Sequence, residues 1–130
     1  MLQYSDYINK LRTNQNKSNL LVIYGAGTIG KLTLYALKEK NIKVDYFCDN
    51  DSNKWNTEIE NIKIIPPNDL DKFDKNIDIF ITYYLFSAIV PSFENKGFKN
   101  LYLSTGLLTD TSIDTFCKKN YKYSYVKLMR

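Results

Sequence analysis

The sequence contains no histidine, and this absence excludes several common kinds of enzyme site. Histidine is the most frequent general base and the most frequent nitrogen ligand of metals in proteins. A Ser-His-Asp triad, a zinc site of the usual kind and a histidine-based acyl transfer are therefore excluded within this chain. No other catalytic constellation is visible, so the sequence leaves open whether the protein is an enzyme.

Cysteine is also scarce, because Cys48 and Cys117 are the only two and form no CxxC pair. Cys48 falls in an apolar run, where a free cysteine usually acts as a small buried hydrophobe. The longest apolar stretch, residues 79–93, is broken by polar residues and is shorter than the ~20 residues needed to span a bilayer. Since no secretory signal is recognisable, we expect a cytoplasmic protein without a membrane span.

The chain has only a small excess of positive charge, because 18 basic and 14 acidic side chains give a net charge of +4. A nucleic-acid-binding domain normally shows a stronger basic stripe or a known docking motif. We therefore expect no nucleic acid as a partner, and we interpret the basic residues near the C-terminus as a solvated surface.

The length and composition fit one domain. The chain has 130 residues, of which 44% are hydrophobic and 25% charged, close to the ordinary globular mix. We expect a single Rossmann-like domain over residues 1–130, with an N-terminal helix and connector (1–19), a core (20–103) and a C-terminal helix or tail (104–130).

Apolar runs alternate with helical patterns along the core. Five runs predict strands at residues 20–24, 44–48, 62–65, 77–81 and 101–103. Helices are predicted after the first strand, at 68–73 with Asn68 as its cap, and at 85–96, where Gly97 ends the helix and Pro91 marks a start or a kink. This alternation predicts an α/β fold: a Rossmann-like open parallel sheet of about five strands in the order 3-2-1-4-5, with helices on both faces.

Glycines follow the first strand with the spacing G-x-G-x-x-G, in the run Gly25-Ala26-Gly27-Thr28-Ile29-Gly30. Gly25 allows a tight exit from the strand, Gly27 lets a phosphate approach the backbone, and Gly30 lets the helix pack closely on the sheet. The amides that follow are unpaired donors at a helix N-terminus, which suits a pyrophosphate. The run predicts a nucleotide site, and a Rossmann-like fold that binds nothing is the alternative.

Asp49 ends the second strand, about 20 residues after the glycine run, where an acid accepts hydrogen bonds from a ribose 2′-hydroxyl. Because its carboxylate would repel a 2′-phosphate, NAD is favoured over NADP. Capping of the following turn is an alternative role for Asp49. Since ligands bind at the carboxyl ends of the strands where the strand order reverses, we add Asn50, Thr82 and Tyr83 to the predicted nucleotide contacts.

Other polar residues give weaker signals. Tyr84, Ser104, Thr105 and Gly106 also follow strands, and Lys31 follows the glycine run, but packing or solvation explains them as well. Tyr123 and Lys127, with Ser112 upstream, match the catalytic group of short-chain dehydrogenases in few letters only. The glycine spacing and the chain length of that family differ, so we expect no catalysis by this pair.

Three segments together resemble a known family. They are residues 23–31, the acidic run Asp49-Asn50-Asp51, and Asn53-Lys54-Trp55 before the proline-ended strand. They are similar to the Rossmann-like nucleotide-binding domain attached to bacterial surface-polysaccharide enzymes, as the N-terminal domain of sugar O- and N-acyltransferases and as modules of saccharide methyltransferases.

In the acyltransferases this domain holds the nucleotide part of a UDP-sugar, and the chemistry lies in a separate β-helix. The resemblance implies nucleotide contacts at Gly25, Gly27, Gly30 and Asp49. This chain departs from the family in having Asn56 where those relatives often carry glycine, and in having neither a histidine base nor hexapeptide repeats.

Three functions stay open. The leading hypothesis is a nucleotide-binding module for a UDP-sugar or NAD, in a bacterial surface-polysaccharide or sugar-tailoring protein, with further domains of a larger saccharide-modifying protein or a second copy of the chain as partners. The first alternative is a small NAD-dependent oxidoreductase that acts on a sugar nucleotide, for which Tyr83, Tyr84 or Lys31 would supply the proton. The second is an interaction domain without a ligand.

Overall fold

A computed structural model describes residues 6–7, 19–82 and 86–104 of the chain. The strands are β1 (Leu21–Tyr24), β2 (Tyr46–Cys48), β3 (Glu58–Ile59), β4 (Ile62–Ile65), β5 (Asp78–Ile81) and β6 (Asn100–Leu103). The helices are α2 (Thr28–Glu39) and α3 (Phe86–Asn95), and two short 3-10 helices are η1 (Ser52–Lys54) and η2 (Pro67–Lys72).

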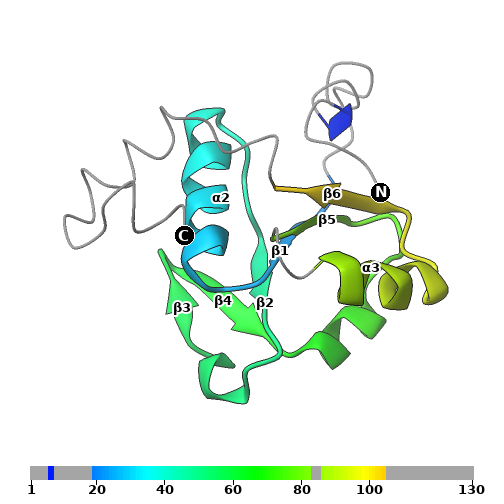
Figure 1. Ribbon diagram of the computed structural model, residues 1–130. Coiled ribbons are helices and arrows are strands. Elements are labelled where there is room, and N and C mark those ends of the chain that lie inside the picture. The colour runs from blue at the N-terminus through cyan, green and yellow to red at the C-terminus, as the bar shows by residue number, and fades with distance from the viewer. Residues whose placement is uncertain (1–5, 8–18, 83–85, 105–130) are drawn as a thin grey trace.

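The described strands form one six-stranded sheet in the order β3-β4-β2-β1-β5-β6 (Figure 1). β1 pairs in parallel with β2 and β5, while β2 pairs with β4 and β5 with β6 in the same sense. Without β3, this order is the predicted 3-2-1-4-5, so the α/β Rossmann-like prediction is confirmed. The order reverses between β1 and β5, which places the expected ligand-binding edge beside the end of β1.

β3 is an addition that the sequence did not predict. It pairs antiparallel with β4 through a hairpin whose two turn residues, Glu60 and Asn61, have φ angles of 52° and 65°. A two-residue hairpin turn of this kind usually carries asparagine or glycine pairs. Glu60 lacks that signal, but it accepts a hydrogen bond at 2.8 Å from the Tyr35 hydroxyl of α2 and lies 3.5 Å from the Lys38 ammonium. Helix α2 therefore holds the hairpin in place.

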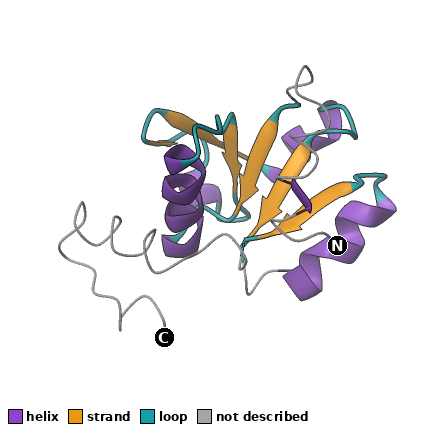
Figure 2. Ribbon diagram, turned by 90° about the horizontal axis from the view of Figure 1, so that it is seen from above, coloured by secondary structure: helices purple, strands orange, loops and turns teal. Residues whose placement is uncertain are grey.

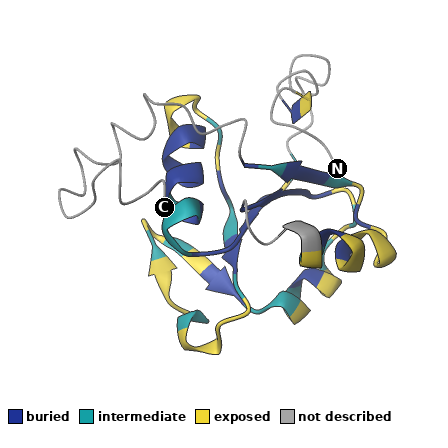
Figure 3. Ribbon diagram, viewed as in Figure 1, coloured by how far each residue is buried: buried dark blue, intermediate teal, exposed yellow. Residues whose placement is uncertain are grey.

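Alternate residues of each strand build a core on each face of the sheet. Leu21 and Ile23 of β1 belong to the core that packs under α2, whereas Val22 and Tyr24 belong to the core under α3 and η2 (Figures 2 and 3). All four residues of β1 are buried. A central strand covered on both sides needs such a continuous apolar run, which is why residues 20–24 were recognisable from the sequence.

Helix ends follow the predictions in part. Gly97 has a φ of 94° and its amide donates to the Glu94 carbonyl at 3.0 Å, so its predicted role at the end of α3 is confirmed. Pro91 lies inside α3, so the expectation that it could mark the start of a helix is wrong. The cap predicted at Asn68 is wrong, because Pro66 is the N-cap of η2 and Pro67 its first residue. Proline suits that first position because its missing amide would have no acceptor there.

Several predictions lie outside the described residues. They are most of the N-terminal helix, the C-terminal helix or tail, Cys117, and the tyrosine–lysine pair near the C-terminus. Tyr7 is described, and its ring packs edge-on against Phe80 and Tyr102 with centroid distances of 5.2 and 5.1 Å. None of the helices in the described part of the chain has the length and apolar character needed to cross a membrane.

Candidate functional site

The glycine run forms the turn between β1 and α2, at the edge where the strand order reverses. Gly25 has a φ of 111°, in the left-handed region that side chains disfavour. A Cβ added to Gly30 would overlap the carbonyl oxygen of Gly25 and would touch the ring of Phe47. The backbone geometry therefore requires glycine at Gly25 and at Gly30, and it brings the first turn of α2 directly against the end of β1.

Gly27 stands at the start of α2 in a different role. It is the N-cap of the helix, with φ −94° and ψ −157°, an extended conformation that any residue adopts. It supplies no side-chain cap, and the first turn of the helix carries no acidic residue. The first intrahelical hydrogen bond is donated by Lys31 to the Gly27 carbonyl at 3.0 Å. The amides of Thr28, Ile29 and Gly30 therefore have no intrahelical acceptor and carry the partial positive charge of the helix end.

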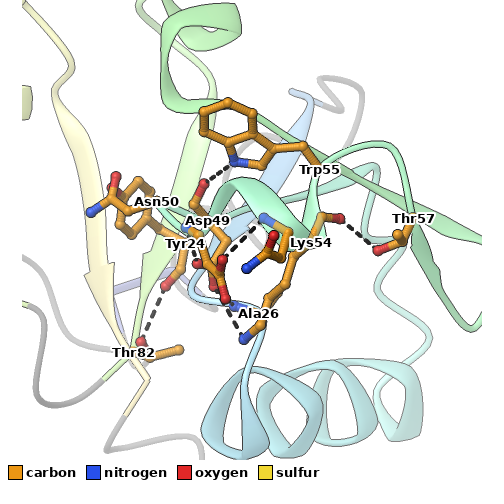
Figure 4. A network of polar contacts seen from close by, with 10 residues as sticks. Tyr24, Ala26, Asp49, Asn50, Lys54, Trp55, Thr57 and Thr82 are labelled. Atoms are coloured by element: carbon orange, nitrogen blue, oxygen red, sulfur yellow. Dashed lines mark hydrogen bonds and ion pairs between the residues drawn. The ribbon is translucent and has the colours of Figure 1, made fainter.

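Asp49 directs its carboxylate at this turn (Figure 4). Its Oδ2 accepts a hydrogen bond from the Ala26 amide at 2.8 Å, and its Oδ1 accepts one from the Asp51 amide at 2.8 Å. Asp49 thus faces the glycine turn and also closes the turn that follows β2, so the two roles considered from the sequence are compatible. A carboxylate can accept about four hydrogen bonds, which leaves capacity for a ligand hydroxyl.

The loop after β2 is held by further polar contacts of its own. The Asp51 carboxylate accepts from the Asn53 amide at 3.0 Å and caps η1, and the Trp55 indole donates to the Asp49 carbonyl at 2.6 Å. Asn56 has a φ of 63°. Asparagine and glycine are the residues that tolerate this conformation best, which explains how Asn56 stands where similar domains often carry glycine.

A cavity of about 220 Å³ lies between the glycine turn and this loop. It contains two oppositely charged side chains, Asp49 and Lys54, whose Oδ2 and Nζ atoms are 3.8 Å apart. Its lining residues come from the turn, the first turn of α2, the loop after β2 and the end of β5, and they are Gly25, Gly27, Ile29, Gly30, Asp49, Lys54 and Thr82.

Six of the ten predicted contact residues line this cavity, and the other four have different positions. Ala26 contributes its amide to Asp49, and Thr28 is the first residue of α2. The Asn50 carboxamide oxygen accepts from the Tyr24 hydroxyl at 2.6 Å and is not among the lining atoms. Tyr83 lies outside the described residues, as do Tyr84, Thr105 and Gly106.

Lys54 was not predicted as a site residue, although it formed part of the resemblance. A lysine in a polar loop is usually solvated, and no sequence pattern places this one opposite Asp49. The sequence shows only that Asp49 and Lys54 are close together in the chain. In the structure, Lys54 ends a 3-10 helix, and its ammonium lies 3.8 Å from the Asp49 carboxylate.

Buried, uncharged side chains stand at the ends of β1, β2 and β5, next to the site. Both the amide and the hydroxyl of Thr82 donate to the Tyr24 carbonyl at 3.2 Å, and Thr82 is 2% exposed. Burial, with a smaller contribution from Cys48, raises the pKa of Tyr24 to about 12. Burial, followed by the charge of Asp49, raises the pKa of the Cys48 thiol to about 12. Both groups are therefore protonated and unreactive at neutral pH.

Solved structures share this fold. RSP, a Rex-family repressor, matches with a TM-score of 0.55 and 14% identity, covering 98% of this chain and 71% of that chain. RSP in complex with beta-NADH matches with a TM-score of 0.52 and 15% identity, covering 91% and 68%. UDP-D-quinovosamine 4-dehydrogenase from Vibrio fischeri is 23% identical, with a TM-score of 0.48 over 67% of this chain and 76% of that chain.

A family model also matches the sequence. The model described as C2185-like, N-terminal, covers residues 17–90, which include the glycine turn, Asp49, Lys54 and β5. No curated protein matches the chain.

Proposed function

The chain belongs to the C2185-like, N-terminal family, and from this premise we propose that it is a nucleotide-binding domain whose glycine turn holds the diphosphate of its ligand. The observation that carries the proposal is the position of Asp49 across from the open first turn of α2. Uncapped amides suit phosphate oxygens, and a carboxylate at the end of β2 suits a ribose hydroxyl.

Two nucleotides share this chemistry. NAD is supported by Asp49 and by the fold that the chain shares with RSP, which was solved in complex with NADH. A UDP-sugar is supported by the resemblance to domains of bacterial surface-polysaccharide enzymes. Both ligands join a ribose to a diphosphate, so the glycine turn and Asp49 serve either one. We place the domain in a sugar-tailoring protein, acting with other domains or with a second copy of itself.

A thermal-shift panel tests the proposal. The intact chain is heated with NAD, NADP, UDP, UDP-N-acetylglucosamine and S-adenosylmethionine in turn. A ligand present at ~100 times its dissociation constant stabilises the folded state by about 2.7 kcal/mol, which raises the melting temperature measurably. We expect a rise with NAD or with the uridine nucleotides and none with S-adenosylmethionine.

Gly27→Val is the variant for this panel. Gly27 lines the cavity in a backbone conformation open to any residue, so a valine side chain enters the binding space while the fold is retained. We expect the variant to melt near the wild-type temperature and to lose the nucleotide response. A panel without any response contradicts the proposal and favours the ligand-free interaction domain.

A change at the absorbance band of the reduced cofactor separates a binding module from an oxidoreductase. If NAD stabilises the chain, adding a sugar nucleotide to the complex leaves this band unchanged for a binding module. Production of NADH would instead assign the oxidoreductase function.

A further inference from the structure

Among the described residues that line the cavity, Lys54 carries the only positive side chain, and it faces the only negative one, Asp49. We propose that Lys54 is a specificity-determining residue: its ammonium leaves Asp49 when ligand binds and pairs with a phosphate group of the nucleotide. The inference rests on the proposed function, because it assigns a residue to the phosphate of that ligand.

The ion pair between Lys54 and Asp49 is loose. The Nζ and Oδ2 atoms are 3.8 Å apart, which is longer than a hydrogen bond. The same Oδ2 already accepts the Ala26 amide at 2.8 Å, so Asp49 keeps its place without Lys54. The Lys54 side chain is 39% exposed. Within the described part of the chain this long contact with Asp49 is the ion pair of Lys54, and an ammonium on a flexible stem can exchange such a partner for a ligand phosphate at small cost.

The backbone that carries Lys54 is, by contrast, firmly held. Its amide donates to the Asp51 carbonyl at 3.0 Å, and its own carbonyl accepts from the amide and the hydroxyl of Thr57 at 3.2 and 2.5 Å. The indole of the next residue, Trp55, donates to the Asp49 carbonyl at 2.6 Å. The fixed backbone keeps the Lys54 ammonium beside Asp49 and the cavity, while the loose ion pair lets the end of the side chain turn toward a ligand (Figure 4).

The charge balance of the cavity gives Lys54 its effect on specificity. Alone, the Asp49 carboxylate would repel any phosphate that entered the same space of about 220 Å³. Lys54 neutralises that charge, so the positive end of α2 determines the attraction of the site for an anion. The pair also weakens the rejection of a 2′-phosphate that Asp49 would otherwise impose.

Calorimetric titrations of the intact chain test this role. The ligands are NAD, NADP and UDP, with adenosine and uridine as nucleosides without phosphate. The variants are Lys54→Gln and Lys54→Met, which remove the charge, and Lys54→Arg, which keeps it. The matched control is Lys43→Gln, because Lys43 lies 3.5 Å from Asp45 before β2 as Lys54 lies near Asp49 after β2, and because its side chain is 87% exposed.

We expect Lys54→Gln to bind the nucleotide with about tenfold lower affinity than the wild type, as is typical when a charge-assisted contact is lost. Its affinity should also depend less on salt, and its preference for NAD over NADP should increase. Lys54→Arg should restore most of the affinity, nucleoside binding should not change, and Lys43→Gln should match the wild type.

Contrary results separate the two proposals. If the wild type binds a nucleotide and both Lys54→Gln and Lys54→Met bind it as Lys43→Gln does, the role of Lys54 is wrong and the nucleotide site stands. If adenosine or uridine is weakened as much as the nucleotides are, Lys54 acts on the shape of the loop and the phosphate role is wrong. If the wild type binds none of the nucleotides, both proposals are wrong.

Discussion

The carboxylate of Asp49 accepts a hydrogen bond from the backbone amide of Ala26 at 2.8 Å, joining the end of β2 to the glycine turn after β1. A second contact of the same length occurs at the other end of these strands, where the Asp45 carboxylate accepts the Leu21 amide at 2.8 Å. The two aspartates are also similarly buried, with side chains 15% and 16% exposed. Asp45 is therefore a matched control for Asp49, because only Asp49 lies at the proposed site.

Replacing each aspartate by asparagine should separate stability from binding. The Ala26 and Asp51 amides donate to different oxygens of Asp49, and Asp49→Asn replaces one of these oxygens by an NH2 group, which cannot accept, so one of the two hydrogen bonds is lost. We expect a loss of about 1–3 kcal/mol in the free energy of unfolding, measured by urea denaturation. Asp45→Asn should also be destabilised. Nucleotide affinity should fall in Asp49→Asn alone, and an equal fall in both variants would mean that Asp49 acts only on stability.

The glycines of the turn should differ in the cost of an added methyl group. In Gly30→Ala the new Cβ would overlap the Gly25 carbonyl oxygen, so α2 must shift away from β1. We expect about 2 kcal/mol of destabilisation, as for other overpacked sites. Gly27→Ala should unfold at nearly the wild-type denaturant concentration because its backbone is extended. Equal stability of the two variants would contradict the close approach of α2 to β1.

Trp55 offers a spectroscopic test of the loop, since it is the only tryptophan in the chain. Its indole is bonded to the Asp49 carbonyl, so ligand contact with Asp49 or Lys54 should alter its emission. We expect nucleotide titrations to change the intensity or wavelength of the fluorescence, with the same midpoint as calorimetry. Trp55→Phe removes the signal and the hydrogen bond, and should lose about 1 kcal/mol of stability. Unchanged fluorescence at saturation would place the ligand elsewhere.

The raised pKa values predict a loss of stability in alkali. Burial raises the pKa of Cys48 from 9.0 to about 12 and that of Tyr24 from 10.0 to about 12. Above pH 9 the unfolded chain releases protons that the folded chain retains, so the free energy of unfolding falls as pH rises toward 12. Below about pH 9 both groups are largely protonated in the folded and in the unfolded chain, so the free energy of unfolding keeps its full value there. Urea denaturation between about pH 8 and 11 should show a shallower fall for Cys48→Ala and for Tyr24→Phe, and identical slopes would contradict the two assignments.

Much of the fold could be predicted because its signals are local. The central strand is a continuous apolar run, and the glycine spacing marks the turn that follows it. The β3–β4 hairpin could not be predicted, because Glu60 adopts a positive φ that its type disfavours and is held there by Tyr35 and Lys38 of α2. That support depends on tertiary contacts, which no local pattern contains.

The candidate site, like the fold, could be predicted only in part. The glycines and Asp49 follow a spacing set by the geometry of the βαβ unit, so their positions around the cavity could be expected. The position of Lys54 could not be predicted, because it depends on η1, the short 3-10 helix that Asp51 caps. Asn50 lies next to Asp49 in the chain, yet its carboxamide oxygen accepts from the Tyr24 hydroxyl, because neighbouring residues after a strand point in different directions.

The most direct test of the nucleotide site is an amide NMR titration of the ¹⁵N-labelled chain with NAD and, separately, with UDP-N-acetylglucosamine. A diphosphate held by the glycine turn should shift the amide resonances of Gly27, Thr28, Ile29 and Gly30 more than those of any other segment, and one of the two ligands should do so saturably. Saturable shifts that avoid these four amides, or no shift with either ligand, would contradict the account.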